Sequence, residues 1–295
     1  MDKQAQLKDL IPEHKFLVCI DSDGCVFNSM EVKHKQFFIP NVISHFRLGP
    51  VEDLVRETWE FVNLYSSSRG TNRFPALIKV FDLLVGRPEI FRERIWLPEL
   101  KLLRKWIDSE TRLGNPALRK FCEANNDAEL KMVLSWSEAV NADIERNLQP
   151  LAPFRHAQDA IIYANTKSDI LVVSQTPFEA LEKEWNENSL SQYVRCIAGQ
   201  ESGTKSEHIA LASNGKYRKE NILMIGDAPG DLKAAKDNGV LFFPVLPGKE
   251  DESWQKLLSD GFPRFFSGKY DIDYMEALEE EFMERLPDLP PWQRT

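Results

Sequence analysis

The sequence feature that most constrains the fold is a short apolar run that ends abruptly at two acidic residues. Lys15–Ile20 reads KFLVCI, and Asp21, Asp23 and Gly24 follow directly. A strand that is hydrophobic on both faces belongs in the middle of a covered parallel sheet, and ligands bind such sheets just beyond the carboxyl ends of the strands. Because Gly24 permits a sharp backbone turn, both carboxylates can face one small volume. This stretch therefore predicts a buried strand that leads into a site.

The composition restricts the number of domains and the kind of partner. The chain has 295 residues, 42% of them hydrophobic, and a net charge of −9 without a basic block. Its length favours one large domain, or a core with an inserted domain. The charge argues against binding to nucleic acid, although a small phosphorylated molecule needs only a few local cations. Since no run approaches the roughly 18 apolar residues of a membrane span, we expect a cytoplasmic protein with no membrane partner.

The four cysteines, at positions 19, 25, 122 and 196, lack the spacing of a zinc site. The five histidines show no metal-ligand spacing either. We therefore expect reduced thiols, with Cys25 as a packed neutral thiol rather than a reactive group.

The segment 28–153 shows helical periodicity and no second apolar strand. Apolar residues recur at three- and four-residue steps over 51–65 and over 130–144, which predicts amphipathic helices in an inserted, all-helical domain. A turn-rich loop between helices contains Arg69 and Arg73. Guanidinium groups grip carboxylates and phosphates, so both arginines are candidates for substrate binding, and a solvated loop is the alternative.

Beyond Pro153 strands alternate with helices, a pattern typical of parallel βα units. Strands are predicted at 169–174, 193–198, 221–225 and 240–245, the last near a sheet edge because it contains a proline. A predicted amphipathic helix around 274–282 and a proline-rich tail follow. Segments 1–27 and 154–295 are therefore expected to form one α/β domain with a Rossmann-like parallel sheet.

If these strands share one sheet, acidic residues from distant parts of the chain meet at its carboxyl edge. They are Asp21, Asp23, Asp227 and Asp231. Carboxylates gathered this closely would repel one another unless a divalent cation held them, and an all-oxygen site favours Mg²⁺ over zinc. Asp21 is then a candidate nucleophile that forms an acyl phosphate. Asp23, whose pKa should rise beside it, is a candidate acid and base.

Three more residues are candidates for contacts with the phosphoryl group or the substrate. Ser174 ends a predicted strand, Gln175 follows it, and Lys205 lies at a predicted helix start, where its charge can balance the nucleophile. Each signal also has a plainer explanation when taken alone. Asp-x-Asp-Gly is often only a turn, Ser174 a strand-end hydroxyl, and Lys205 a solvated lysine, with Lys216 as its rival. Asp231 has an alternative role as a favourable acid at a helix N-terminus.

Taken together and in this order, the motifs resemble those of the haloacid dehalogenase superfamily of hydrolases. The matching positions are Asp21 to Gly24, Ser174, Lys205, and Gly226-Asp227 with Asp231. The resemblance implies the following roles: Asp21 as nucleophile, Asp23 as acid and base, Ser174 and Lys205 as phosphoryl ligands, and Mg²⁺ held by the side chains of Asp21 and Asp227, the carbonyl of Asp23, and Asp231 as a ligand or water holder. Cys25 and Ser206 depart from the usual residues of the first and third motifs.

The resemblance also implies a reaction class. Phosphatases and phosphomutases of this superfamily keep an aspartate where Asp23 stands, and the insertion 28–153 resembles the helical cap of phosphoglycolate phosphatases and β-phosphoglucomutases. We therefore expect a Mg²⁺-dependent phosphomonoester hydrolase that acts on a small phosphorylated metabolite. A phosphomutase and a non-catalytic phospho-ligand-binding protein are the alternatives, and the sequence specifies no oligomeric state.

Overall fold

The computed structural model describes residues 3–293, which group into two compact units. One unit contains the chain up to residue 30 and residues 150–287, and the other contains 31–149 together with the tail from residue 288. The sequence predicts boundaries at 27/28 and 153/154 and assigns the whole tail to the α/β domain. In the structure the boundaries lie at 30/31 and 149/150, and the tail groups with the helical unit.

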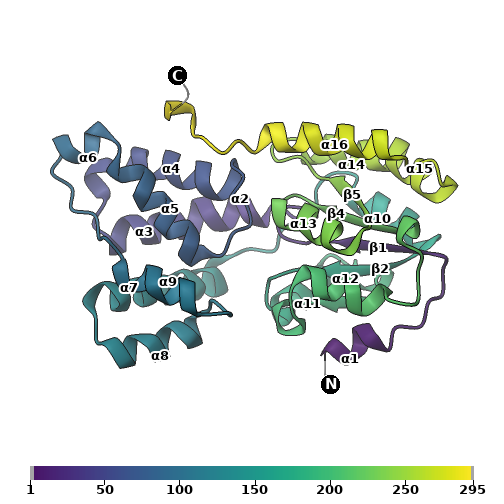
Figure 1. The fold of residues 1–295 in the computed structure, drawn as a ribbon, viewed down its shortest axis with the longest axis horizontal. Helices are drawn as coiled ribbons and strands as arrows, with labels where there is room; N and C mark the ends of the chain where they lie inside the picture. The colour runs from purple at the N-terminus through teal and green to yellow at the C-terminus, as the bar shows by residue number, and fades with distance from the viewer. Residues whose placement is uncertain (1–2, 294–295) are drawn as a thin grey trace. The chain divides into compact units, whose positions relative to one another are not determined.

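The α/β unit is built on a parallel five-stranded sheet with the order β3-β2-β1-β4-β5 (Figure 1). Its strands are β1 (Phe16–Ile20), β2 (Ser168–Val173), β3 (Cys196–Ala198), β4 (Ile222–Gly226) and β5 (Leu241–Pro244). Ile20 pairs with Val172 of β2 and Ile225 of β4, so these three strands end side by side. The strand order reverses beside β1, which is where sheets of this kind open a crevice. The predicted parallel α/β core is confirmed.

Alternate strand residues face two layers of helices, which explains why the strands are apolar throughout. Val18 and Ile20 lie in one core cluster, and Leu17 and Cys19 lie in another. The first cluster is covered by α10 (Ala157–Asn165), α11 (Phe178–Glu187), α14 (Glu250–Lys256) and α15 (Phe262–Ser267). The second is covered by α1 (Lys3–Lys8), α12 (Lys205–Ser213) and α13 (Pro229–Asn238).

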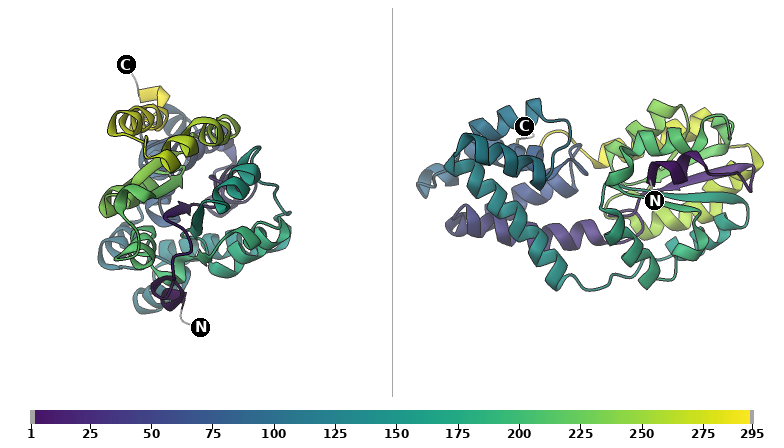
Figure 2. Two further views of the ribbon diagram at one scale, coloured as in Figure 1. Left: turned by 90° about the vertical axis from the view of Figure 1, so that its right-hand side faces the viewer. Right: turned by 90° about the horizontal axis from the view of Figure 1, so that it is seen from below.

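Both edge strands of the sheet are covered by helices. α16 (Ile272–Arg285) packs against β5, and α1 packs against β3 and α12 (Figures 1 and 2). A helix that covers an edge strand shields its unpaired backbone N–H and C=O groups, which could otherwise pair with another chain.

The helical unit has its own hydrophobic core, which includes the fully buried Trp59 and Trp136. Its elements are α2 (Ser29–Lys33), which begins in the α/β unit, then a π-helical turn η1 (His34–Phe38), α3 (Ile39–His45), α4 (Glu52–Leu64), α5 (Arg73–Val85), α6 (Pro88–Arg92), α7 (Lys101–Ser109), α8 (Asn115–Asn125) and α9 (Ala128–Asn147). The two predicted apolar stripes correspond to α4 and α9, and the predicted all-helical insertion is confirmed. Within residues 3–293, no helix has both the length and the apolar character that crossing a membrane requires.

Candidate functional site

Asp21 and Asp23 lie in a tight loop directly after β1. The backbone N–H of Asp21 donates to the carbonyl of Ile225 at 3.0 Å, so the contact with β4 continues one residue past the strand. Gly24 has a φ of +79°, and its N–H donates to the carbonyl of Phe27 at 2.9 Å. The turn therefore depends on a backbone conformation that glycine adopts without strain.

Two buried tryptophans support this loop from helices far away in the sequence. Trp185 Nε1 donates to Ser22 Oγ at 3.0 Å, and Trp254 Nε1 donates to the carbonyl of Cys25 at 2.8 Å. Burial raises the pKa of the Cys25 thiol well above its usual value, and nearby carboxylates raise it further. The prediction of a packed neutral thiol is confirmed. Neither tryptophan could be predicted for the site from the sequence, because a single indole carries no signature of what it will contact.

Three of the predicted metal residues form one buried cluster. Asp21, Asp227 and Asp231 each offer a carboxylate oxygen within 4.8 Å of the others, and all three are at most 4% exposed. Asp21 follows β1, whereas Asp227 and Asp231 belong to the connection from β4 to α13. The parallel register thus brings together acids that are some two hundred residues apart. The role expected of Asp23 concerns its carbonyl, so its side chain need not join the cluster.

Lys205 connects two of these carboxylates. Its Nζ lies 2.7 Å from Asp21 Oδ2 and 2.6 Å from Asp231 Oδ1. Burial alone would lower the pKa of Lys205, but the two carboxylates raise it overall, so the ammonium stays charged. Burial raises the pKa of Asp21 well above its usual value; Lys205 opposes this rise, and Asp231 and Asp227 add to it.

The rival lysine lies elsewhere. Lys216 Nζ donates to the carbonyls of Leu7 and Lys8, at 3.0 and 2.6 Å, at the end of α1. Lys205 is instead placed at the first position of α12, where the side chain of Thr204 caps the helix and Glu207 completes a capping box. The predicted helix start therefore explains why Lys205 is the lysine that contacts Asp21.

Asp231 also has the capping role that was its alternative explanation. Its Oδ2 accepts hydrogen bonds from the backbone N–H groups of Asp227, at 3.2 Å, and Ala228, at 3.0 Å. The side chain folds back over Gly226, where a Cβ atom would overlap it. Asp231 thus fixes both the N-terminus of α13 and the ammonium of Lys205.

Asp23 is half-buried and is held by two hydroxyl groups. Thr176 Oγ1 donates to its Oδ2 at 2.6 Å, and Ser29 Oγ donates to its Oδ1. These bonds tie the loop after β2 and the start of α2 to the first motif. Neither Thr176 nor Ser29 was predicted for the site, because an isolated hydroxyl residue gives no sequence signal.

Ser174 and Gln175 link the loops after β2 and β3. Ser174 is 2% exposed, its N–H donates to the carbonyl of Ala198 at 3.0 Å, and its Oγ accepts from the N–H of Thr176 at 3.2 Å. The exposed Gln175 donates from Nε2 to the carbonyl of Gly203 at 2.9 Å. Gln175 therefore braces the segment that leads into Lys205, and contact with a substrate remains a prediction for both residues.

Arg69 and Arg73 lie in the helical unit and make contacts within it. Arg69 is only 3% exposed, and its Nη1 donates to the carbonyl of Leu64 at 2.9 Å, so the solvated-loop alternative is wrong for this residue. Arg73 Nη1 donates to the carbonyl and the hydroxyl of Ser137, both at 3.0 Å, and its guanidinium lies over the ring of Phe38. Burial lowers the pKa of Arg73 to about 10. Substrate binding by these arginines stays a prediction.

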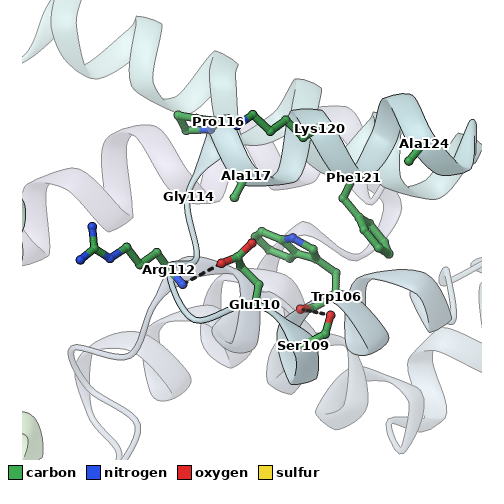
Figure 3. A pocket seen from close by; sticks show the side chains of 10 residues that line it. All are labelled: Trp106, Ser109, Glu110, Arg112, Gly114, Pro116, Ala117, Lys120, Phe121 and Ala124. Atoms are coloured by element: carbon green, nitrogen blue, oxygen red, sulfur yellow. Dashed lines mark hydrogen bonds between the residues drawn. The ribbon is translucent and has the colours of Figure 1, made fainter.

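A separate groove of about 600 Å³ lies in the helical unit between α7 and α8 (Figure 3). Trp106 and Phe121 contribute apolar surface, and Arg112 and Lys120 carry positive charge. The carboxylate of Glu110 accepts hydrogen bonds from the backbone N–H groups of Thr111 and Arg112. None of the residues predicted for the site lines this groove.

No family model and no curated protein matches the chain. Among solved structures, it is similar to a putative haloacid dehalogenase-like hydrolase from Bacteroides fragilis, with 13% identity and a TM-score of 0.50 over 81% of this chain and 92% of that one. It is also similar to a putative phosphoglycolate phosphatase from Lactobacillus delbrueckii subsp. bulgaricus, with 15% identity, a TM-score of 0.48, and 78% and 85% of the two chains covered. The first of these similarities, together with the parallel sheet and its strand order, shows that the chain has the fold of the haloacid dehalogenase-like hydrolases.

Proposed function

We propose that this protein is a Mg²⁺-dependent phosphomonoester hydrolase that acts on a small phosphorylated metabolite through a phosphoaspartate at Asp21. The observation that supports this best is the contact of one lysine ammonium, on Lys205, with Asp21 and Asp231 inside a buried carboxylate cluster. A buried cluster of this kind, at the carboxyl ends of parallel strands, suits a ligand that brings both a metal ion and an anionic group.

The donor set fits Mg²⁺. Asp21, Asp227 and Asp231 supply only hard oxygen ligands, and with Lys205 they leave two negative charges that a divalent cation would neutralise. Asp21 and Asp227 would hold the ion by their side chains, with the carbonyl of Asp23 and with Asp231 as a ligand or water holder. When bound, the ion would offset the charge of the phosphoryl oxygens during transfer.

The chain's own residues then divide the reaction into two steps. In the first, the Asp21 carboxylate attacks phosphorus, the bond to the leaving oxygen breaks, and Asp23 gives that oxygen a proton. In the second, Asp23 takes a proton from water, the water oxygen attacks phosphorus, and the bond to Asp21 breaks, releasing phosphate. Thr176 and Ser29 orient the Asp23 carboxyl for both proton transfers, and Lys205 compensates the negative charge.

The test is phosphate release from a panel of phosphorylated metabolites with Mg²⁺ and with EDTA. We expect Mg²⁺-dependent release that falls by about 10³-fold or more in Asp21→Asn. Lys216→Met removes a lysine whose hydrogen bonds all lie outside the cluster, at the end of α1. This variant should retain activity and serves as the matched control. Absence of turnover over the panel would contradict the proposal. Isomerisation of a sugar phosphate that requires a bisphosphate, without phosphate release, would indicate a mutase instead.

A further inference from the structure

The C-terminal segment is anchored by side chains at both ends, each in a different unit. Leu286, which follows α16, is 1% exposed and lies in a core cluster of the α/β unit. Trp292 packs against the hydrophobic core of the helical unit. The chain between these two residues is therefore a connection between two anchors rather than a loose end.

The anchor at Trp292 is specific. Its ring packs edge-on against Phe61 of α4, with centroids 5.7 Å apart, and the guanidinium carbon of Arg87 lies 4.6 Å from its ring centroid. Arg87 is itself held in place by Glu57 at 3.0 Å and Glu89 at 3.6 Å. An aromatic pair and a cation–π contact each contribute about 1 kcal/mol beyond the burial of apolar area.

The connection is also short and stiff. Six residue steps from Leu286 to Trp292 span at most about 20 Å when fully extended. Pro287, Pro290 and Pro291 lie within this stretch, and each proline fixes φ, which restricts the conformations of the chain. Pro291 begins a short 3₁₀ turn, Pro291–Gln293, that carries Trp292. While both anchors are in place, the covalent chain therefore limits their separation to about 20 Å.

We propose that residues 287–292 are a tether that limits how far the helical unit can move away from the α/β unit. Apart from this tail, the chain passes between the units only at 30/31 and 149/150. The crossing at 30/31 lies within α2, and the crossing at 149/150 follows the end of α9. Two such crossings permit a hinge motion, and a third, anchored crossing restricts its amplitude. The tether does not depend on the proposed chemistry, and it is tested without a substrate.

The experiment measures the distance distribution between spin labels on the two units by pulsed electron resonance. Labels at Glu123→Cys and Lys219→Cys, both at exposed positions, are introduced in a Cys196→Ser background that keeps the buried cysteines. One variant is Trp292→Ala. A second inserts six Gly and Ser residues between Pro287 and Asp288, which adds about 13 Å of root-mean-square reach and leaves Trp292 unchanged. Trp292→Phe, which keeps an aromatic ring at the anchor, is the control.

We expect Trp292→Ala and the insertion each to at least double the width of the distribution, and Trp292→Phe to leave it narrow. If the insertion leaves the width unchanged, the tether is ruled out, whatever Trp292→Ala does. Broadening by Trp292→Ala alone would mean that this tryptophan only stabilises the helical unit. Thermal unfolding followed by circular dichroism verifies that the insertion variant keeps both units folded.

Discussion

The ammonium group of Lys205 compensates the negative charge of two buried carboxylates, those of Asp21 and Asp231. Lys205→Met should lower the free energy of unfolding by about 3 kcal/mol at pH 8 in EDTA, because it leaves uncompensated buried charge. The pKa of Asp21 is already raised, and losing Lys205 raises it further. A group whose pKa is raised by folding favours the folded state below its unfolded pKa and loses that contribution as pH rises. The deficit should therefore shrink between pH 8 and pH 5, as measured by urea unfolding.

Lys216→Met provides the comparison for this variant. Lys216 also bonds to two oxygen atoms, but they are backbone carbonyls that do not titrate. Its loss of stability should be similar at pH 8 and pH 5. A deficit of Lys205→Met that is equally independent of pH would contradict the coupling with Asp21.

Asp169 is a buried acid outside the carboxylate cluster, and it lies at the opposite end of the sheet from the site. It accepts hydrogen bonds from Tyr217 at 2.7 Å, Arg195 at 2.6 Å and the backbone N–H groups of Glu13 and His14, both at 3.0 Å. Burial would raise the pKa of Asp169, but the hydrogen bonds and Arg195 lower it overall. Asp169 thus fastens the segment between α1 and β1 to β2.

Asp169→Asn should cost about 2 kcal/mol of unfolding free energy at pH 7, because hydrogen bonds to a charged group are lost. A pKa lowered by folding gives stability that is present above the unfolded pKa of about 4 and is lost as pH falls through the folded pKa. The difference between wild type and variant should therefore shrink on acidification below pH 4. Urea unfolding from pH 7 to pH 3 measures it, and an undiminished difference at pH 3 would contradict this account.

What the sequence predicted at this scale depends on the chemistry of each side chain. Asp21, Asp227, Asp231 and Lys205 follow strands or start a helix in recognisable motifs, and the structure brings them into one buried cluster. Thr176, which contacts Asp23, could not be predicted in this way. A hydroxyl becomes relevant only through the distance that the fold gives it.

At the scale of elements, the N-terminus of α13 depends on a glycine. In Gly226→Ala the new Cβ would overlap the Asp231 side chain, which would have to leave its capping position and its contact with Lys205. We expect a loss of about 2–4 kcal/mol of unfolding free energy, because a buried carboxylate loses its partners. Urea unfolding measures this effect.

Gly230→Ala, in the first turn of α13, is the matched control. Nothing lies within 4 Å of a Cβ at Gly230, and alanine has the higher helix propensity, so this variant should be neutral or slightly stabilising. Similar losses for both variants would show that the position of Asp231 is not what makes Gly226 necessary.

Element boundaries were predicted as well as local pattern allows. The long apolar strands before the site residues were identified because burial on both faces leaves a continuous signal. The weak strand predicted at 193–198 is shorter, Cys196–Ala198, because residues 191–193 form a 3₁₀ turn. The π-helical turns at His34–Phe38 and Leu257–Gly261 were not predicted, since their apolar spacing does not differ from that of an α-helix.

At the scale of the whole molecule, the division into two units followed from the change of pattern near residues 28 and 153. Each unit buries its own apolar side chains, so each of the two sequence patterns corresponds to a separate hydrophobic core. The packing of the tail on the helical unit could not be predicted from the sequence, because one tryptophan among prolines gives no indication of the surface on which it will pack.

Separate cores have a consequence for ligand binding. Asp21, Asp227 and Asp231 all belong to the α/β unit, so Mg²⁺ should stabilise that unit directly. At a hundred times its dissociation constant, a ligand that binds only the folded state adds about 2.7 kcal/mol. Hydrogen exchange of the backbone amides should therefore slow in β1, β4 and α13 when Mg²⁺ is added, and stay unchanged in α4 and α9.

Exchange followed by mass spectrometry measures this difference, and Asp227→Asn, which removes one proposed ligand, should abolish it. An equal slowing in α4 and α9 would mean that the two units open in a single cooperative step, despite their separate cores. If hydrogen exchange in β1 and β4 does not slow at any Mg²⁺ concentration, the ion does not bind the carboxylate cluster, and Lys205 is the one cation among residues 3–293 that offsets its negative charge. That result would argue against a metal-dependent reaction at Asp21, because the uncompensated acids would then repel the phosphoryl group that Asp21 must attack.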